Sequence, residues 1–382
     1  MEDILFLIFC ILSIINIQIK GKNNFNKDYM ALENTSSIRG IFVWLIFMSH
    51  NNSYYKNNKK YIYKIILHCF GQKMVSLFLF YSGFGIYESI TKKGFIYVKN
   101  LPIKSLILFI KFQLILLIFV FNNILLGIKF NFKKYLLSTI FKRNIGNSNW
   151  FAFTIICLYF YSYLSFRFIK SKKLVIVGVF FINIICYFHF LFIYNYFYPY
   201  KKYSVDNILC FVIGIYFSLF KIYLDKIFMK NDILYFGNLI VLIIIYCNLY
   251  SYGKKNIYFI SLTNAFFSLI IVVTSMKIKF GNEFLVILNT HSYSIYLLQR
   301  VVMRFIFYKK FFLKNEFIRF IIIFISVLFI SNLFDHFTNG INEILNFKNK
   351  LLNNKNFDFS KNYVSIKYNE YDLCDLKNIK CK

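Results

Sequence analysis

The chain has 382 residues, of which 58% are hydrophobic, 22% are aromatic and only 16% are charged. Soluble domains carry about 25% charged residues, so this composition excludes a soluble enzyme, a secreted disulfide-rich domain and a DNA-binding protein. The net charge of +30 would suggest a nucleic-acid partner in a soluble chain, but the basic residues here lie in short clusters between long apolar runs. We therefore predict a polytopic all-α membrane protein, with the lipid bilayer and not nucleic acid as its partner.

Apolar segments long enough to cross a bilayer, at about 20 residues each, follow one another along most of the chain. We predict ten or eleven spans, with candidates at 3–19, 38–55, 66–88, 106–128, 150–168, 173–198, 207–224, 233–250, 257–276, 284–308 and 316–334. The loops are short, so any chemistry is expected within or at the edge of the helical bundle. Residues 1–35 would form an extra membrane helix and a basic loop, 36–334 the main membrane domain, and 335–382 a disordered polar tail.

The orientation in the cell membrane is predicted from the N-terminus. Glu2 and Asp3 stand where a signal peptide would have basic residues, which favours a retained first helix with an outside N-terminus. Loop 20–37 and the C-terminal tail would then be cytoplasmic. The positive-inside rule does not decide the matter, because Lys and Arg are spread almost evenly over both sides once the tail is left out.

The cysteines predict no chemistry of their own. Six of the eight lie in or beside apolar runs, where Cys behaves as a small hydrophobe. Cys374 and Cys381 lie in the polar tail and are too loosely spaced for a metal or redox motif. We expect no disulfide framework, no metal site and no tightly bound cofactor.

The first polar constellation is Arg39 and His50, eleven residues apart in one predicted span. At about 100° per residue this separation is within about 20° of three full turns, so both side chains share a helix face about 16 Å apart along the axis. Arg39 could hold the phosphates of a cytoplasmic donor whose reactive end reaches His50, a natural proton acceptor. The alternative is that Arg39 is an interfacial snorkelling residue and His50 simply ends the span.

A second constellation follows at the end of the next span. Ser82 and Gly83 are small residues that allow close helix packing, and packing alone is a sufficient explanation for them. Glu88 is an acid near the interior of a span, although it could simply mark the span's cytoplasmic end. The lysines after it, including Lys99, could bind phosphates or anionic lipid.

The third constellation lies in the predicted span 284–308. At helical spacing Ser292, Tyr296 and Gln299 share a polar face, with His291 nearby. A polar stripe inside a span should face protein or water instead of lipid. Hydrogen bonding between helices explains it as readily as substrate contact does.

These segments, in this order, resemble the acyltransferase-3 family of integral-membrane O-acyltransferases. Arg39-Gly40 and His50 match the family's Arg and His separated by ten residues, and the resemblance covers about residues 36–334. Three further motifs are similar to those of the family: Phe80-Tyr81-Ser82-Gly83-Phe84, Asn149-Trp150-Phe151 and Ser292-Tyr293-Ser294-Ile295-Tyr296-Leu297. The chain departs from the family in its extra first span, in lacking a fused esterase-like domain, and in having Gln299 where many members have a histidine.

The resemblance implies transfer of an acyl group, usually acetyl from acetyl-CoA, to a hydroxyl of a cell-surface polysaccharide or glycolipid. His50 would transfer a proton or carry the acyl group, and Arg39 would position the donor. Residues that could contact the donor or the carbohydrate acceptor are Ser82, Gly83, Glu88, Lys99, Trp150, Ser292, Tyr296 and Gln299.

Two other functions remain open at this point. A transporter or exporter of a lipid-linked or small anionic substrate is equally compatible with the composition. Transporters commonly show internal repeats and broken helices, whereas this sequence shows no repeat and its two prolines, Pro102 and Pro199, are predicted at loop edges. The third possibility is a membrane scaffold for a glycan-assembly complex.

Overall fold

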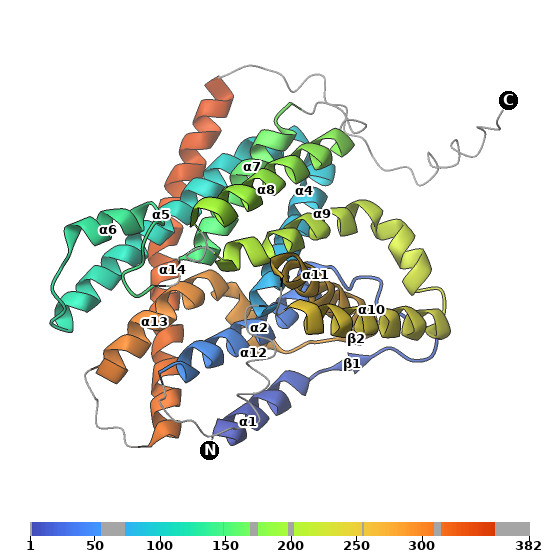
Figure 1. Ribbon diagram of the computed structural model, residues 1–382, viewed down its shortest axis with the longest axis horizontal. Helices are drawn as coiled ribbons and strands as arrows, with labels where there is room; N and C mark the ends of the chain where they lie inside the picture. Colours follow the sequence, from blue (N-terminus) through green and yellow to red (C-terminus); the bar gives the residue numbers. More distant parts are fainter. Residues whose placement is uncertain are drawn as a thin grey trace. The chain divides into compact units, whose positions relative to one another are not determined.

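The computed structural model describes residues 2–54, 73–147, 149–168, 175–197, 202–253, 256–308 and 315–355. Within these ranges the chain forms thirteen α-helices and one two-stranded ribbon (Figure 1). It divides into two compact units, Met1–Thr338 and Asn339–Lys382. Several predicted features lie outside the described ranges: residues 66–72 of the predicted span 66–88, Pro199, Cys374, Cys381 and the tail beyond Lys355.

The helices follow in chain order with short connections. They are α1 (Glu2–Ile14), α2 (Leu32–Asn52), α4 (Lys73–Lys93), α5 (Phe95–Leu125), α6 (Phe132–Thr139), α7 (Trp150–Phe166), α8 (Val175–Phe197), α9 (Lys202–Phe228), α10 (Asp232–Gly253), α11 (Ile257–Thr274), α12 (Glu283–Thr290), α13 (Ser292–Tyr308) and α14 (Glu316–Lys355). The strands β1 (Gln18–Ile19) and β2 (Ile278–Lys279) pair antiparallel. This ribbon joins the loop before α2 to the loop before α12 (Figure 1).

The described helices confirm the predicted fold class, a polytopic all-α membrane protein. Five of them are long and apolar enough to cross a bilayer, at Phe95–Leu125, Val175–Ile193, Asp206–Phe228, Asp232–Tyr252 and Glu316–Ile341. Two shorter helices, Trp150–Phe166 and Tyr258–Thr274, are also apolar. Large apolar side chains on the long helices are exposed, among them Ile233 at 84% and Ile240 at 55%. An apolar outer surface of this kind suits a lipid environment.

The structure corrects several predicted boundaries. The segment 284–308 is two helices, α12 and α13, which meet at His291. Pro102 lies inside α5 and not at a loop edge. The last helix continues past residue 334 to Lys355, so residues 335–355 are helical instead of disordered.

The helices α2 and α4 are 21 residues each but are not among the five long apolar helices. Their average hydropathy is low because both carry many polar residues, such as Asn34, Arg39 and His50 on α2 and Ser82 and Glu88 on α4. Most residues of both helices are nevertheless buried. Polar residues on buried helices need protein partners or a cavity, and both helices contribute to the wall of an internal cavity.

Close backbone packing holds these two helices. A Cβ atom at Gly83 of α4 would overlap the carbonyl oxygen of Phe211 on α9, and one at Gly40 of α2 would overlap the carbonyl oxygen of Leu285 on α12. Small residues let helices approach in this way inside a membrane. Gly83 therefore serves packing against α9, the alternative already given for it, and it does not line the cavities described below.

Candidate functional site

An inner cavity of about 190 Å³ lies between α2, α4, α5, α7 and α13. One face of α2 supplies Arg39, Val43 and Ile46 to its wall. These three residues have the spacing i, i+4 and i+7, which is one helix face, and His50 is the next position on that face. The predicted common face of Arg39 and His50 therefore runs along the cavity.

A wider vestibule of about 740 Å³ adjoins the inner cavity. It is lined by the loop before α2, the C-terminal half of α4 and parts of α5, α7 and α9. Arg39, Ser82 and Tyr159 line both spaces, so they mark the junction between them. The vestibule has five basic residues against two acidic ones: Lys27, Arg39, Lys92, Lys93 and Lys221 against Asp28 and Glu88.

Arg39 is held at the junction by neutral groups. Its Nε donates to the carbonyl oxygen of Thr35 at 3.3 Å, and its Nη2 lies 3.5 Å from the hydroxyls of Thr35 and Ser36. The guanidinium carbon is 5.8 Å from the centre of the Tyr81 ring. Among the described residues, no carboxylate lies within ion-pair distance of Arg39. The positive charge at the junction is therefore available to an anion.

Two acids near the vestibule are already paired. Glu88 forms an ion pair with Lys92 at 3.0 Å and accepts a hydrogen bond from Ser218 at 3.0 Å. Asp225 lies one turn from Lys221 and pairs with it at 2.6 Å. No such pair is found for Lys27 and Lys93 within the described ranges, and both are exposed. Lysines with these positions can attract a polyanion into the vestibule.

At the other end of the inner cavity, Gln299 separates the open space from His50. Gln299 lines the cavity and is fully buried, and its Nε2 lies 2.8 Å from Nδ1 of His50. An amide nitrogen donates, so Nδ1 accepts and the proton of the neutral imidazole is on Nε2. The amide oxygen of Gln299 is buried and has no hydrogen-bond partner among the described residues. A buried acceptor of this kind calls for a donor from a ligand or a water molecule.

The third constellation comes together as its helical spacing suggested. Ser292, Tyr296 and Gln299 all line the inner cavity from α13. The Tyr296 ring is 6.0 Å from the His50 ring and 5.2 Å from the Phe151 ring. Residue Phe151 is itself a lining residue, so an aromatic wall lies beside His50.

Two of the proposed contact residues lie away from both cavities. Trp150 packs edge-on against Phe151, with ring centres 6.1 Å apart, and so stands behind the lining residue. Lys99 is exposed on α5 with its Nζ 5.2 Å from the centre of the Phe95 ring. Neither residue contributes to the lining of the inner cavity or the vestibule.

Sequence reasoning missed several lining residues. Tyr81, Tyr159 and Tyr293 contribute to the two cavities but are three among 31 tyrosines. A weak signal exists for Tyr159, because Phe151, Ile155 and Tyr159 are spaced by four residues and all line the inner cavity. In a chain this rich in apolar residues, such spacing occurs on nearly every helix and does not single out a site.

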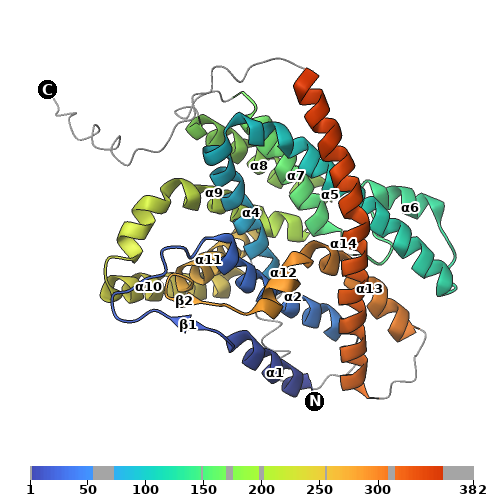
Figure 2. The same ribbon diagram turned by 180° about the vertical axis from the view of Figure 1, so that it is seen from behind.

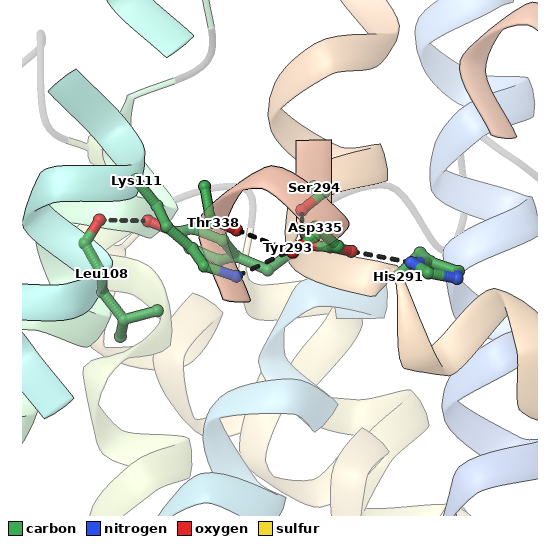
Figure 3. A network of polar contacts seen from close by, with 7 residues as sticks. All are labelled: Leu108, Lys111, His291, Tyr293, Ser294, Asp335 and Thr338. Atoms are coloured by element: carbon green, nitrogen blue, oxygen red, sulfur yellow. Dashed lines mark hydrogen bonds and ion pairs between the residues drawn. The ribbon is translucent and has the colours of Figure 1, made fainter. Parts of the chain in front are cut away.

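A polar network was also missed (Figure 3), and it adjoins Leu108 and Tyr293, which line the inner cavity. Its acid is Asp335 of α14, which accepts hydrogen bonds from Ser294 at 2.6 Å, His291 at 2.7 Å and Lys111 at 3.2 Å. We call these four residues the Asp335 network. The sequence had placed Asp335 in the polar tail, and its partners are 41 to 224 residues away along the chain.

In the described part of the chain, no three His, Cys, Asp or Glu side chains gather as the ligands of a metal ion would. No family model matches the chain, and no curated protein or solved structure shows detectable similarity to it.

The fold and the site define the class of the molecule, a helical membrane protein with an internal, largely apolar cavity that a few polar side chains line.

Proposed function

We propose that the protein is a membrane O-acyltransferase that transfers acetyl from acetyl-CoA to a hydroxyl of a cell-surface polysaccharide or glycolipid. The observation that carries the proposal is the position of Arg39. It lies where a basic vestibule meets a narrow cavity, and the far end of that cavity is one hydrogen bond from His50.

The dimensions suit a donor with a highly charged head and a slim thioester arm. The vestibule of about 740 Å³ is within the usual range of small-molecule sites, about 300–1,000 Å³. Its lysines and Arg39 would bind the phosphates of the donor. The inner cavity of about 190 Å³ has room for the acyl end only. Residues of loop 20–37 and of the end of α4, both predicted to be cytoplasmic, line the vestibule together, which agrees with a cytoplasmic donor.

The chemistry requires a base near the thioester carbonyl. The acceptor hydroxyl attacks this carbonyl, an O–acyl bond forms, the C–S bond breaks, and the proton of the hydroxyl ends on the CoA sulfur. A neutral imidazole can receive that proton and return it. In our proposal His50 does this, with Gln299 orienting its ring through Nδ1. Ser82, Ser292 and Tyr296 would provide hydroxyls along the path of the acyl arm.

One observation favours the alternative of a transporter. The helical break between α12 and α13 at His291 occurs without proline and lies beside the partly buried Asp335 network. Broken helices and intramembrane charges are common at transporter binding sites. Binding of labelled acetyl-CoA to the purified protein separates the two functions, because a transporter of another anion would show no binding that depends on Arg39.

The proposal is tested by replacing His50 and Arg39 in cells that carry the gene. We expect His50→Ala to lower acetylation of the surface glycan by at least about 100-fold, the usual contribution of a general base. Arg39→Ala is expected to weaken use of the donor. Mass spectrometry of the isolated glycan measures the acetyl content, and immunoblotting of membranes checks that protein levels are equal.

Matched controls come from exposed residues of the same types. His336→Ala and Arg167→Ala remove an exposed histidine and an exposed arginine that line neither cavity, and we expect both to keep full acetylation. Full acetylation by His50→Ala at equal protein level would contradict the role given to His50.

A further inference from the structure

The Asp335 network connects two parts of the wall of the inner cavity. Its donors come from three places: Lys111 on α5, His291 at the break before α13, and Ser294 in the first turn of α13. The carboxylate itself belongs to α14, which runs beside α5 and α13 in its part before Asn339 (Figure 2). The Asp335 side chain thus connects three segments: α5, the start of α13 with His291 before it, and α14.

The residues between the two anchors line the cavity. His291 and Ser294 bind Asp335, while Ser292 and Tyr293, which lie between them, both face the inner cavity. The four-residue segment is thus fixed at its ends, and its middle forms the wall. Any movement of Asp335 would move the cavity-facing residues.

The neighbouring part of the wall, on α5, is held by the same arrangement. Lys111 is three residues after Leu108 on α5, and Leu108 lines the inner cavity. The hydroxyl of Tyr293 donates to the carbonyl oxygen of Leu108 at 3.1 Å, which links the two parts of the wall directly (Figure 3). Lys111 and Tyr293 therefore both connect α5 to the start of α13, one through Asp335 and one without it.

Leaving any donor of the network without a hydrogen-bond partner inside a membrane would cost free energy. The side chains of Lys111, Asp335 and His291 are 15%, 17% and 19% exposed. Within the described residues, Asp335 is the only acid that pairs with Lys111 and His291. Because Oδ2 of the carboxylate accepts from His291, Nδ1 of that ring carries the proton and the ring has a fixed orientation.

We propose that Asp335 is a positioning residue for the inner cavity, and that its network sets the length of acyl chain the cavity accepts. This inference rests on the proposed acyltransferase function. The cavity is small because its walls are tied together, and a small cavity discriminates against each added methylene. Loosening the tie would let the wall at Ser292 and Tyr293 move outward and admit longer chains.

The first test measures kinetics in membranes with acetyl-CoA and butyryl-CoA. For Asp335→Asn we expect kcat/KM with acetyl-CoA to fall about tenfold, since small misplacements in a site are costly. We expect the ratio of acetyl to butyryl transfer to fall as well. Asp335→Glu, which keeps the charge, should recover part of the selectivity. If Asp335 only stabilised the fold, neither variant would change the ratio of acetyl to butyryl transfer.

The second test reads the geometry of the wall without any activity. In a Ser292→Cys variant, the rate of maleimide labelling at position 292 is measured by peptide mass spectrometry. Losing one buried hydrogen bond favours local opening about 3- to 10-fold, and we expect labelling to accelerate by this factor when Asp335→Asn is added. The matched control is Ser331→Ala, because Ser331 is one turn earlier on α14, fully buried and without a hydrogen-bond partner in the described structure.

The outcomes are distinguishable. Faster labelling with altered acyl selectivity supports the proposal, and unchanged labelling with unchanged selectivity in Asp335→Asn overturns it. If the unmodified protein transfers no acyl group from any acyl-CoA, the proposed function fails, while labelling still tests whether Asp335 positions the wall. If Asp335→Asn does not fold, Ser294→Ala removes one bond without changing any charge, and the same criteria apply to it.

Discussion

The two polar regions of this protein differ in what their polar groups face. Around the inner cavity, Arg39 lies at the junction without a carboxylate partner, and the amide oxygen of Gln299 has no partner in the described structure. In the Asp335 network, by contrast, each oxygen of the carboxylate accepts at least one donor. Unsatisfied groups around an empty space are suited to binding a ligand, and mutually satisfied groups are suited to holding helices in place.

The largest effect on stability should come from breaking the satisfied region. Lys111→Met leaves Asp335 without its lysine partner. Removing one member of a fully buried ion pair costs about 3–5 kcal/mol, and because this pair is only partly buried we expect a cost at the lower end of that range. The double variant Lys111→Met with Asp335→Asn removes both charges and keeps a polar amide beside His291 and Ser294, so it should be closer to wild type in its free energy of unfolding. Thermal unfolding in detergent measures both. A double variant less stable than the single one by the full cost of a second lesion would show that the two residues do not act as a pair.

Packing at Gly83 should have the next effect, and it tests whether this residue belongs to the site at all. Gly83→Ala places a methyl group against the backbone of α9, and overpacking of this kind costs about 1–3 kcal/mol. We expect a lower unfolding temperature with the KM for donor unchanged in the protein that remains folded. The control is Gly237→Ala on α10, since a Cβ there meets nothing within 4 Å and the residue lines neither cavity. A change in KM without loss of stability would return Gly83 to the substrate-contacting residues.

In the unsatisfied region, the effect of Gln299 should be on activity. Gln299→Leu removes the hydrogen bond to Nδ1 of His50, and a hydrogen bond is worth about 0.5–1.5 kcal/mol, or up to about tenfold in rate. The rate of acetyl transfer would fall by that factor with little change in unfolding temperature. Gln299→Glu places a carboxylate, which only accepts, against the accepting Nδ1 of His50, so we expect it not to restore the rate. Equal rates for Leu and Gln at position 299 would mean that the imidazole needs no orientation by this residue.

The smallest effect is expected in the vestibule, where charges are exposed. Lys93→Ala removes one exposed lysine, and such a charge contributes about 0.2–1 kcal/mol. The KM for the donor should rise by about two- to fivefold at low salt, and the difference from wild type should shrink as salt screens the charge. Lys99→Ala, an exposed lysine outside the vestibule, serves as control. An increase in KM that persists at high salt would argue against a purely electrostatic role.

Regular, local features were predictable from the sequence. The common face of Arg39 and His50 and the shared face of Ser292, Tyr296 and Gln299 follow from the helical repeat, which depends only on residues within a few turns. The structure brings the second set into one cavity and places Arg39 in the same wall. The role of His50 as a base and the resemblance to an acyltransferase family stay predictions, supported by this geometry.

Features that depend on distant residues were not predictable. Asp335 was assigned to a polar tail because it follows an apolar run, and only the packing of α14 against α5 and α13 turns it into the acceptor of three donors, one buried and two partly buried. The break at His291 was hidden inside the single predicted span 284–308. Its ring pairs with Asp335, a contact that helical periodicity within the segment does not reveal.

The sequence by itself determined that this is a helical membrane protein, and that any site has to lie among its helices. Composition and apolar segment length decide this, because a bilayer tolerates only backbones that satisfy their own hydrogen bonds. Which polar residues meet, and whether they surround a cavity or satisfy one another, was decided by the tertiary structure alone. Arg39 and Asp335 are both charged residues on membrane-protein helices, and only their neighbours make Arg39 available to a ligand and Asp335 a connection between helices.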